Sequence, residues 1–344
     1  MKHRLNYAEI YITNVCNLSC THCQSFNNFA FKGHQLWDDY QHEYANLSTR
    51  IEFDRLQIIG GEPTLNPDFE KWVTGISNLW PNSKLEISTN GSRPDKLNDN
   101  IYQILSKNNG LVWLTCHNIE TYDKMLDFSK QFLKDIVFDY CPDPESKDNW
   151  KISYNTIKDD SWPDCDQIDQ FVDLPETVKQ EFIKKHRLNA NLDLKTTSRM
   201  LVDKNGVGVR IDWAQTFVPS AIEVINAQQT KLKYNSDPIQ AHANCYFKSC
   251  HQINKGKLYK CPLVSVLPDF LDQFNVDISS DDLKLANEYT PISNLDDDST
   301  ISKFVNDINQ PIPQCKFCPI KYNKHNFVGT DKKIKIIPAQ KLTL

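Results

Sequence analysis

Three cysteines near the start of the chain constrain its fold and chemistry more than any other feature. Cys16, Cys20 and Cys23 form a Cys-x3-Cys-x2-Cys pattern. They follow residues 8–13, an alternating run of β-branched and aromatic residues that predicts a strand. The triad is therefore expected on the loop that leaves this strand, which is where α/β barrels carry their chemistry.

Three thiolates make an iron–sulfur ligand set that is one ligand short. A [4Fe–4S] cluster is normally held by four thiolates, so a loop supplying three leaves one iron for another ligand. A structural zinc site or three ordinary buried thiols are the alternatives, and His3 or His34 could complete a zinc site. The flanking sequence favours the cluster.

Length and composition set outer bounds on the function. The 344 residues can bury a large core and form two domains. The formal net charge of −5 gives no overall attraction to phosphate backbones, so nucleic acid is not an expected partner. Without a bilayer-spanning apolar run or a signal peptide, we expect a cytoplasmic protein with no membrane partner, whose 11 cysteines serve metal or redox chemistry.

Strand-like and helix-like segments alternate through the first half of the chain. Further strands are predicted at 53–59, 84–89, 111–115, 136–140 and 207–211. One helix is predicted after a cap at Asn66, and the next carries Leu97, Ile101, Ile104 and Leu105 on one face. Residues 141–173 are hard to assign, although 151–155 could form a strand. The alternation predicts βαβ units and a parallel sheet.

A glycine-rich turn ends the second strand. It consists of Gly60, Gly61, Glu62 and Pro63. Glycine allows close backbone approach to a ligand, and the carboxylate can accept a hydrogen bond from an ammonium group. Alone, this segment would be an ordinary turn. Its place after the second strand, downstream of the cysteine triad, favours a role in ligand binding.

Polar residues also follow the next strands. Ser88 and Asn90 close the third strand and could meet a ribose or a carboxylate, although Asn90 also starts a simple Asn-Gly turn. Thr115 and His117 end the fourth strand, where a satisfied loop histidine is an equal alternative. Asp139 on the fifth strand could face a cavity, but a structural hydrogen bond is the favoured interpretation.

On these motifs the chain resembles the radical S-adenosylmethionine (radical SAM) superfamily. In that family the cysteine loop follows the first barrel strand, and an aromatic residue usually precedes the third cysteine, where His22 stands here. The resemblance implies an α/β fold with a partial (β/α)6 TIM-type barrel. By position it implies cluster ligands at Cys16, Cys20 and Cys23, and S-adenosylmethionine contacts from Gly60, Gly61, Glu62, Pro63, Ser88, Asn90 and Thr115.

A second cysteine group lies in the C-terminal region. Cys250, Cys261, Cys315 and Cys318 supply four thiolates, and Gly256 lies midway between the first two, in a segment that predicts a hairpin. Four thiolates also suit a zinc ribbon. The spacing resembles the twitch domain, a shortened relative of the SPASM domain, which implies one auxiliary [4Fe–4S] cluster. We therefore expect a barrel domain over 1–235 and a small α+β iron–sulfur domain over 236–344.

Four cysteines fall outside these patterns. Cys245 could replace a ligand, but we favour a buried thiol. Cys116, Cys141 and Cys165 fit no spacing, and any of them could project into the active site.

The resemblance implies reductive cleavage of S-adenosylmethionine to a 5′-deoxyadenosyl radical that abstracts hydrogen from a substrate. A closed auxiliary cluster favours a net oxidation, and an electron donor such as flavodoxin or ferredoxin is the expected partner. Peptide and small-molecule substrates stay open, although the first strand begins too early for an N-terminal leader-recognition domain. The alternative is a non-catalytic zinc- or iron–sulfur-binding protein with a degenerate barrel, against which the intact triad and Gly-Gly-Glu-Pro motif argue.

Overall fold

The structure is a computed structural model that describes residues 2–20, 23–117, 119–140, 198–213, 220–226, 229–245, 247–321 and 329–330. Its strands are β1 (His3–Tyr11), β2 (Ser19–Cys20), β3 (Ile51–Ile59), β4 (Lys84–Thr89), β5 (Leu111–Cys116), β6 (Ile136–Tyr140), β7 (Ser198–Asp203), β8 (Gly208–Trp213), β9 (Ile222–Asn226), β10 (Gln229–Leu232), β11 (His251–Asn254), β12 (Lys257–Tyr259) and β13 (Gly329–Thr330). Its α-helices are α1 (Trp37–Arg50), α2 (Phe69–Leu79), α3 (Asp99–Ser106), α4 (Ile119–Phe132), α7 (Pro238–Ala243), α8 (Pro262–Gln273), α9 (Ser280–Asn287) and α10 (Asp298–Asp307). Short 3-10 turns are η1 (Pro63–Leu65), η2 (Pro94–Lys96) and η4 (Pro313–Phe317).

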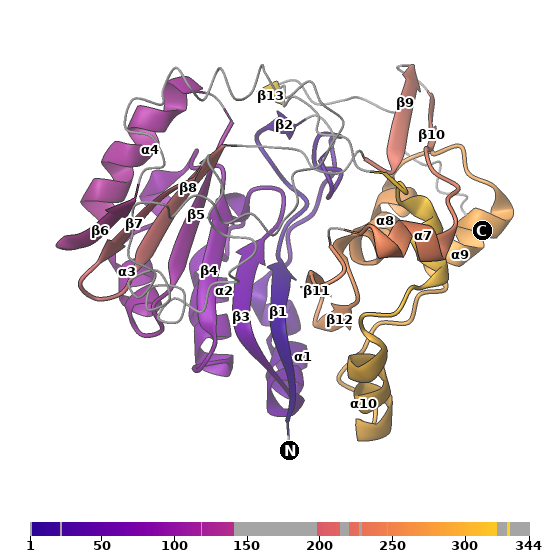
Figure 1. Cartoon of the computed structure of the whole chain (residues 1–344), viewed down its shortest axis with the longest axis horizontal. Coiled ribbons are helices and arrows are strands. Elements are labelled where there is room, and N and C mark those ends of the chain that lie inside the picture. Colours follow the sequence, from indigo (N-terminus) through magenta and orange to yellow (C-terminus); the bar gives the residue numbers. More distant parts are fainter. Residues whose placement is uncertain are drawn as a thin grey trace.

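The main sheet of the described residues has nine strands in the order β12-β11-β1-β3-β4-β5-β8-β7-β6 (Figure 1). The central pairs from β11 to β8 are parallel, whereas β12, β7 and β6 pair antiparallel at the two edges. The expected α/β class with a largely parallel sheet is confirmed. Parallel neighbours bring the carboxyl ends of β1, β3, β4 and β5 to one edge of the sheet, where the candidate site residues stand.

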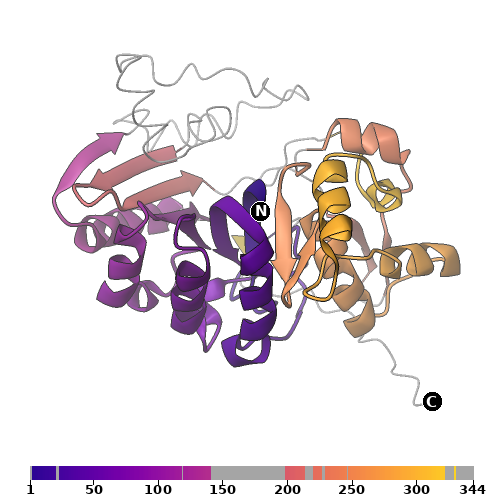
Figure 2. The ribbon, with the colours of Figure 1, turned by 90° about the horizontal axis from the view of Figure 1, so that it is seen from below.

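Helices α1 to α4 cover one face of the curved sheet (Figure 2). The apolar side chains of alternate strand positions, such as Ile10, Ile58 and Ile87, are fully buried against this layer. Burial of this apolar surface is the main favourable term in the stability of the layer. It anchors each strand so that the loops at the strand ends start from fixed positions.

The opposite face of the sheet is polar. Arg55 makes a two-pronged ion pair with the buried Glu86 at 2.9 and 3.0 Å, and Arg210 stacks 4.3 Å from the centre of the Trp113 ring. Burial alone would raise the pKa of the Glu86 carboxyl, but Arg55 and the nearby Lys84 hold it below its usual value. A charged and hydrogen-bonded inner face suits a polar ligand better than an apolar one.

The pairing of the fifth predicted strand differs from the expectation. The strand at 136–140 is present, but it pairs antiparallel with β7 at the sheet edge, while β8 takes the parallel place beside β5. The reason is the short turn that joins β7 to β8, with Gly206 at φ +82°, because so short a connection joins only antiparallel strands. The strand considered at 151–155 lies outside the described residues.

The helix predicted with Asn66 as its cap begins two residues later than expected, at Phe69, with Asp68 as its cap. The Asn66 side chain instead donates to the carbonyls of Ile12 and Gln35 at 2.7 and 2.8 Å, because both carbonyls lie buried beside it. Helix α1 was not predicted. Its buried contacts come mainly from Tyr44 and Leu47, although Trp37, Tyr40, Tyr44 and Leu47 do recur at helical spacing.

The C-terminal elements lie beside the β1 edge of the sheet and continue it through β11 and β12. A second apolar cluster joins them to the loop that follows β2, with Phe26, Phe29 and Phe31 packed around Phe270 of α8. Lys255 and Gly256 both have positive φ in the β11–β12 turn, as a tight hairpin requires. Within the described residues, no helix is both long and apolar enough to cross a membrane.

Candidate active site

The cysteine triad occupies the loop between β1 and α1. All three cysteines are half-buried, and the N–H of Cys23 donates to the carbonyl of Cys20 at 3.3 Å. The N–H of Leu18 points at the Cys16 sulfur at 3.4 Å, and β2 within the loop pairs with β13. The loop is thus a folded turn in which one backbone N–H, that of Leu18, is directed at a cysteine sulfur.

The Gly60–Gly61 segment packs directly on this loop. The N–H groups of Gly61 and Glu62 donate to the carbonyls of Thr13 and Val15, both at 2.8 Å. A Cβ atom at Gly61 would lie 2.4 Å from the Val15 carbonyl oxygen, and one at Gly60 would lie 2.7 Å from that of Thr13. Only glycine permits this approach, so the turn fixes where the cysteine loop begins.

Glu62 has a role that the sequence did not indicate. Its carboxylate is 1% exposed and accepts from Thr64 N at 3.1 Å, Thr64 Oγ1 at 2.5 Å, Thr89 Oγ1 at 2.6 Å and Asn90 N at 2.7 Å. Burial raises the pKa of Glu62, and these hydrogen bonds oppose the rise. The carboxylate therefore joins the end of β3 to the end of β4. Pro63 is buried beside it as the first residue of η1.

Asn90 connects β4 to the cysteine loop. Its amide Nδ2 donates to Asn17 Oδ1 at 2.9 Å, and Asn17 lies between the first two cysteines of the triad. Its Oδ1 accepts from Ser92 N at 2.9 Å, which forms the expected turn as well. Sequence reasoning missed Asn17, Thr64 and Thr89, whose roles depend on which strand ends become neighbours.

The remaining predicted polar residues lie on or next to β4 and β5. Ser88 and Thr115 are half-buried on these strands. His117 Nδ1 lies 3.8 Å from Cys20 Sγ, and burial lowers the pKa of His117 to about 4, so the ring is neutral at physiological pH. Cys116 is fully buried in the apolar core, with its sulfur 3.7 Å from Thr121 Oγ1, and so does not project into the site.

The structure also bears on other residues named from the sequence. His3 opens β1 and lies about 26 Å from the triad end of the strand, so it cannot complete a zinc site there. His34 instead bonds Thr13 Oγ1 at 2.9 Å. Asp139 pairs with Arg199 at 2.6 and 2.9 Å, the structural bond that was favoured. His22, Cys141 and Cys165 lie outside the described residues.

The four C-terminal cysteines gather around one hairpin and one turn. Cys250 and Cys261 flank β11 and β12, while Cys315 lies in η4 and Cys318 ends it. Burial raises the pKa of all four thiols, that of Cys261 to about 12, and neighbouring thiolates raise them further. Within the described part of the chain, no three potential ligands converge on a point that would hold a single metal ion.

Cys245 belongs to this neighbourhood. It follows α7, which packs against η4, and its charge raises the pKa of each of the four cysteines in the set. It is half-buried rather than a core thiol. One contact between this set and the main sheet was not predicted. The Cys250 thiol donates to Glu9 Oε1 on the inner face of β1 at 2.9 Å.

Comparison with known proteins decides the family of the N-terminal part. Residues 10–137 match the family model described as Radical SAM superfamily. This stretch is a radical SAM domain. It contains the cysteine loop, the Gly60–Gly61 segment and the β4 end described above, and it implies a [4Fe–4S] cluster and S-adenosylmethionine as its cofactors.

Curated relatives match only part of this radical SAM domain. A GTP 3′,8-cyclase of Alkaliphilus oremlandii is 30% identical over 90 residues, which is 26% of this chain and 28% of the relative. A GTP 3′,8-cyclase of Mannheimia succiniciproducens is 32% identical over 92 residues, 26% of this chain and 27% of the relative. The chain therefore matches little more than a quarter of the length of these relatives.

Solved structures are similar at a lower level. The structure of Streptococcus suis SuiB bound to S-adenosylmethionine has a TM-score of 0.30 and 20% identity, and the match covers 37% of this chain and 31% of that chain. The structure of BtrN in complex with AdoMet and 2-DOIA has a TM-score of 0.25 and 21% identity, with 33% and 47% of the two chains covered.

The residues present fit the groups that a radical SAM domain implies. At the triad, three thiols share a loop in which the Leu18 N–H is directed at the Cys16 sulfur, a contact that suits an anionic ligand. At the C-terminal set, burial raises the pKa of the thiols, and thiolates there would repel one another. The triad therefore suits thiolate–metal chemistry, whereas the buried thiols of the C-terminal set would ionise only beside a bound cation such as iron or zinc.

Proposed function

We propose that this radical SAM enzyme uses Cys16, Cys20 and Cys23 to hold a [4Fe–4S] cluster with one iron open to S-adenosylmethionine. When bound, the two groups supply a strongly oxidising carbon radical that removes a hydrogen atom from substrate. The observation that carries the proposal is the packing of the Gly61 and Glu62 backbone on the triad loop. Any side chain at position 61 would displace that loop.

The strand ends supply the orientation that such chemistry needs. Gly60 and Gly61 bring their backbone into close contact with the start of the triad loop, while Ser88, Asn90 and Thr115 place small polar groups at the ends of β4 and β5. These five residues are the proposed cofactor contacts. Glu62 and Pro63 support these residues and do not contact the cofactor themselves, because the Glu62 carboxylate is already bonded to the end of β4.

We further propose that Cys250, Cys261, Cys315 and Cys318 hold an auxiliary [4Fe–4S] cluster in a C-terminal twitch-like domain. Four protein ligands would leave no iron open to substrate, which favours a net oxidation. The substrate is a peptide or a polar small molecule, as the charged inner face of the sheet suggests. Flavodoxin or ferredoxin would supply the electron.

The test begins with anaerobic purification, followed by iron, sulfide and zinc analysis. About eight irons per chain and release of 5′-deoxyadenosine after addition of dithionite and S-adenosylmethionine support the proposal. Four irons with cleavage would reject the auxiliary cluster alone. One zinc and no cleavage would favour the non-catalytic metal-binding alternative.

The substrate class needs a separate assay. Candidate peptides, aminoglycoside precursors and GTP, which names the activity of the curated relatives, can be screened for increased 5′-deoxyadenosine release. A product lighter by two hydrogens would support a net oxidation, whereas a product of unchanged mass would indicate a cyclisation or rearrangement instead.

A further inference from the structure

The segments that carry the two cysteine groups are connected by a continuous series of buried polar contacts. At the N-terminal end, the Cys23 thiol points at Asn27 Oδ1 at 3.7 Å. Asn27 is 2% exposed and donates to the Tyr11 hydroxyl at 3.3 Å and to the Asn14 carbonyl at 2.6 Å. Tyr11 ends β1, so this first part joins the triad to the sheet.

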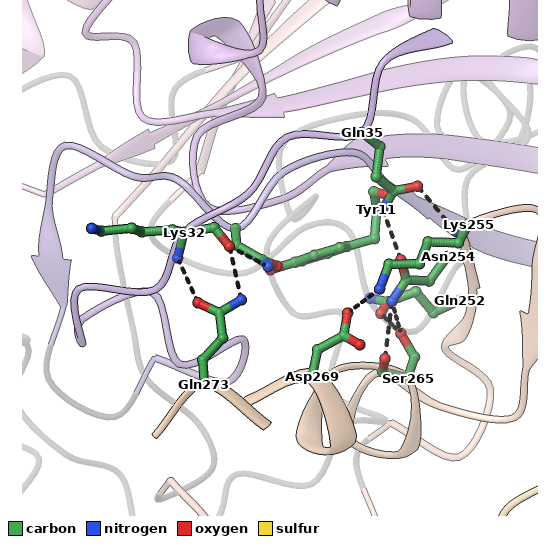
Figure 3. A network of polar contacts seen from close by, with 10 residues as sticks. Tyr11, Lys32, Gln35, Gln252, Asn254, Lys255, Ser265, Asp269 and Gln273 are labelled. Carbon is green, nitrogen blue, oxygen red and sulfur yellow. Dashed lines mark hydrogen bonds and ion pairs between the residues drawn. The ribbon is translucent and has the colours of Figure 1, made fainter. Parts of the chain in front are cut away.

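Gln35 forms the centre of the series (Figure 3). Its Nε2 donates to the Tyr11 carbonyl at 2.6 Å and to Asn254 Oδ1 at 2.7 Å, and its Oε1 accepts from Lys255 N at 3.0 Å. The side chain thus bonds β1 on one side and the β11–β12 hairpin on the other. Gln35 is itself buried, so water does not replace these bonds.

The remaining contacts lead to the C-terminal cysteines. Asn254 donates to the Ser265 carbonyl at 2.9 Å, and the Ser265 hydroxyl donates to Gln252. Gln252 Nε2 donates to Glu9 Oε2 at 3.1 Å, and Glu9 Oε1 accepts from the Cys250 thiol at 2.9 Å. Gln252 and Asn254 are almost fully buried.

Apolar contacts also join the N-terminal loop to the C-terminal elements, but they do not fix the relative position of the two parts. Phe26, Phe29 and Phe31 pack on Phe270 and Phe274 at ring distances of 4.7 to 6.4 Å. Such burial is attractive but non-directional, so it would tolerate small slides of α8. Hydrogen bonds lose strength quickly with distance and angle, and a buried donor left without its partner is costly.

We propose that Gln35 is a positioning residue that sets the place of the C-terminal cysteine group relative to the triad. The inference rests on the proposed function in that both groups are taken to hold clusters. Gln35 lies outside both β1 and the hairpin, and in this series its side chain is the one that bonds to each of them.

A matched control lies at the rim of the same boundary. Gln273 on α8 also bonds across it, accepting from Lys32 N at 3.3 Å and donating to the Lys32 carbonyl at 3.1 Å, but these contacts are exposed (Figure 3). Gln35→Ala and Gln273→Ala therefore remove the same side chain from the same boundary. They differ in whether the buried series is cut.

The spectroscopic test uses the full-length, iron-loaded protein with both clusters reduced. The magnetic interaction between the clusters, measured by electron paramagnetic resonance, should match the wild type in Gln273→Ala. In Gln35→Ala, at unchanged iron content, the strength of this interaction should fall, or its distribution should broaden, by about twofold. The reason is that the separation of the clusters is no longer fixed. An unchanged interaction in Gln35→Ala, or an equal change in Gln273→Ala, would overturn the inference.

A second measurement does not depend on clusters. Hydrogen exchange in residues 251–259 and 23–36 should rise about tenfold in Gln35→Ala and much less in Gln273→Ala. If the wild type holds only about four irons, the auxiliary cluster is rejected and exchange alone judges the inference. If Gln35→Ala does not fold, Gln35→Glu keeps the bond from Lys255 N, removes both donated bonds and should change exchange in the same direction.

Discussion

The two cysteine regions of this protein differ in how their surroundings treat sulfur. At the N-terminal triad the thiols are half-buried, and the nearby groups are backbone N–H groups, amides and a neutral imidazole. At the C-terminal group the thiols lie close to one another, and burial raises the pKa of each. A carboxylate, Glu9, adjoins the C-terminal group, whereas the Glu62 carboxylate, whose backbone packs on the triad loop, is bonded to the end of β4.

The surroundings of each cysteine group match the number of protein ligands proposed for its cluster. If the triad exchanges a ligand as proposed, it needs partly exposed thiols beside neutral hydrogen-bonding groups, as the half-buried cysteines beside Leu18 N–H and His117 are. A site closed by four protein ligands can be buried, because nothing has to enter. The comparison therefore predicts separate losses when each region is changed.

The largest effect should come from the triad. Replacing Cys16, Cys20 and Cys23 together by alanine should abolish cleavage of S-adenosylmethionine and remove about half of the iron, since only the C-terminal ligands remain. Iron analysis and chromatography of 5′-deoxyadenosine measure both. Retention of all iron would break the comparison, because the triad would then hold none.

The C-terminal counterpart is Cys261→Ala combined with Cys315→Ala. This variant should also lose about half of the iron, but it should still cleave S-adenosylmethionine at a rate within about threefold of the wild type, because the triad is intact. Substrate turnover should be lost. Complete loss of cleavage would show that the two regions do not act separately.

Gly61→Ala tests the packing that supports the triad. The added Cβ would meet the Val15 carbonyl oxygen at 2.4 Å, so the loop must move. We expect a loss of about 3 kcal/mol in unfolding free energy and a fall of about tenfold or more in cleavage. Wild-type stability and activity would show that the loop adjusts freely.

Glu62→Gln separates positioning from cofactor binding. An amide has one oxygen and an NH2 group in place of the second, so at least one of the four donors that Glu62 serves loses its acceptor. We expect about 2 kcal/mol of destabilisation without any cofactor present, measured by thermal unfolding. Glu70→Gln, on the exposed start of α2, is the control. If the two variants melt alike and only cofactor affinity falls, Glu62 acts on the ligand instead.

The smallest effect concerns pH. The folded chain holds the pKa of His117 at about 4, below its ordinary value of 6.5, because of burial. The unfolded chain therefore binds this proton first as pH falls, and stability should decline between about pH 6.5 and pH 4 while remaining intact above it. Urea unfolding should show a loss of about 1 kcal/mol at about pH 5.8 relative to pH 7.5. His117→Gln should reduce this difference.

Local patterns predicted much of the fold. The strands at 84–89 and 136–140 have the predicted bounds, since each is a short apolar run between clear turn signals. The orientation of β6 could not be predicted, because it depends on which strand occupies the place beside β5. Helix α1 was missed because its exposed positions are strongly polar and only a few of its residues are buried.

The site was predictable as motifs but not as contacts. Nothing in the sequence indicates that Glu62 bonds Thr89 rather than a ligand, or that Asn17 meets Asn90. These pairs form only because β3 and β4 are neighbours in the sheet. Likewise, Cys245 follows no spacing rule, and its nearness to the C-terminal group depends on the packing of α7 against η4.

The pairing of β11 with β1 has a consequence for modularity. The C-terminal unit continues the sheet of the radical SAM domain in register, with Glu9 opposite Gln252 and Tyr11 opposite Asn254. Removing everything after residue 235 would uncover an edge strand that carries Tyr7 and Glu9, which invites aggregation. An evolutionary exchange of this unit would therefore have to bring a strand that fits the same edge, so the two halves are expected to change together.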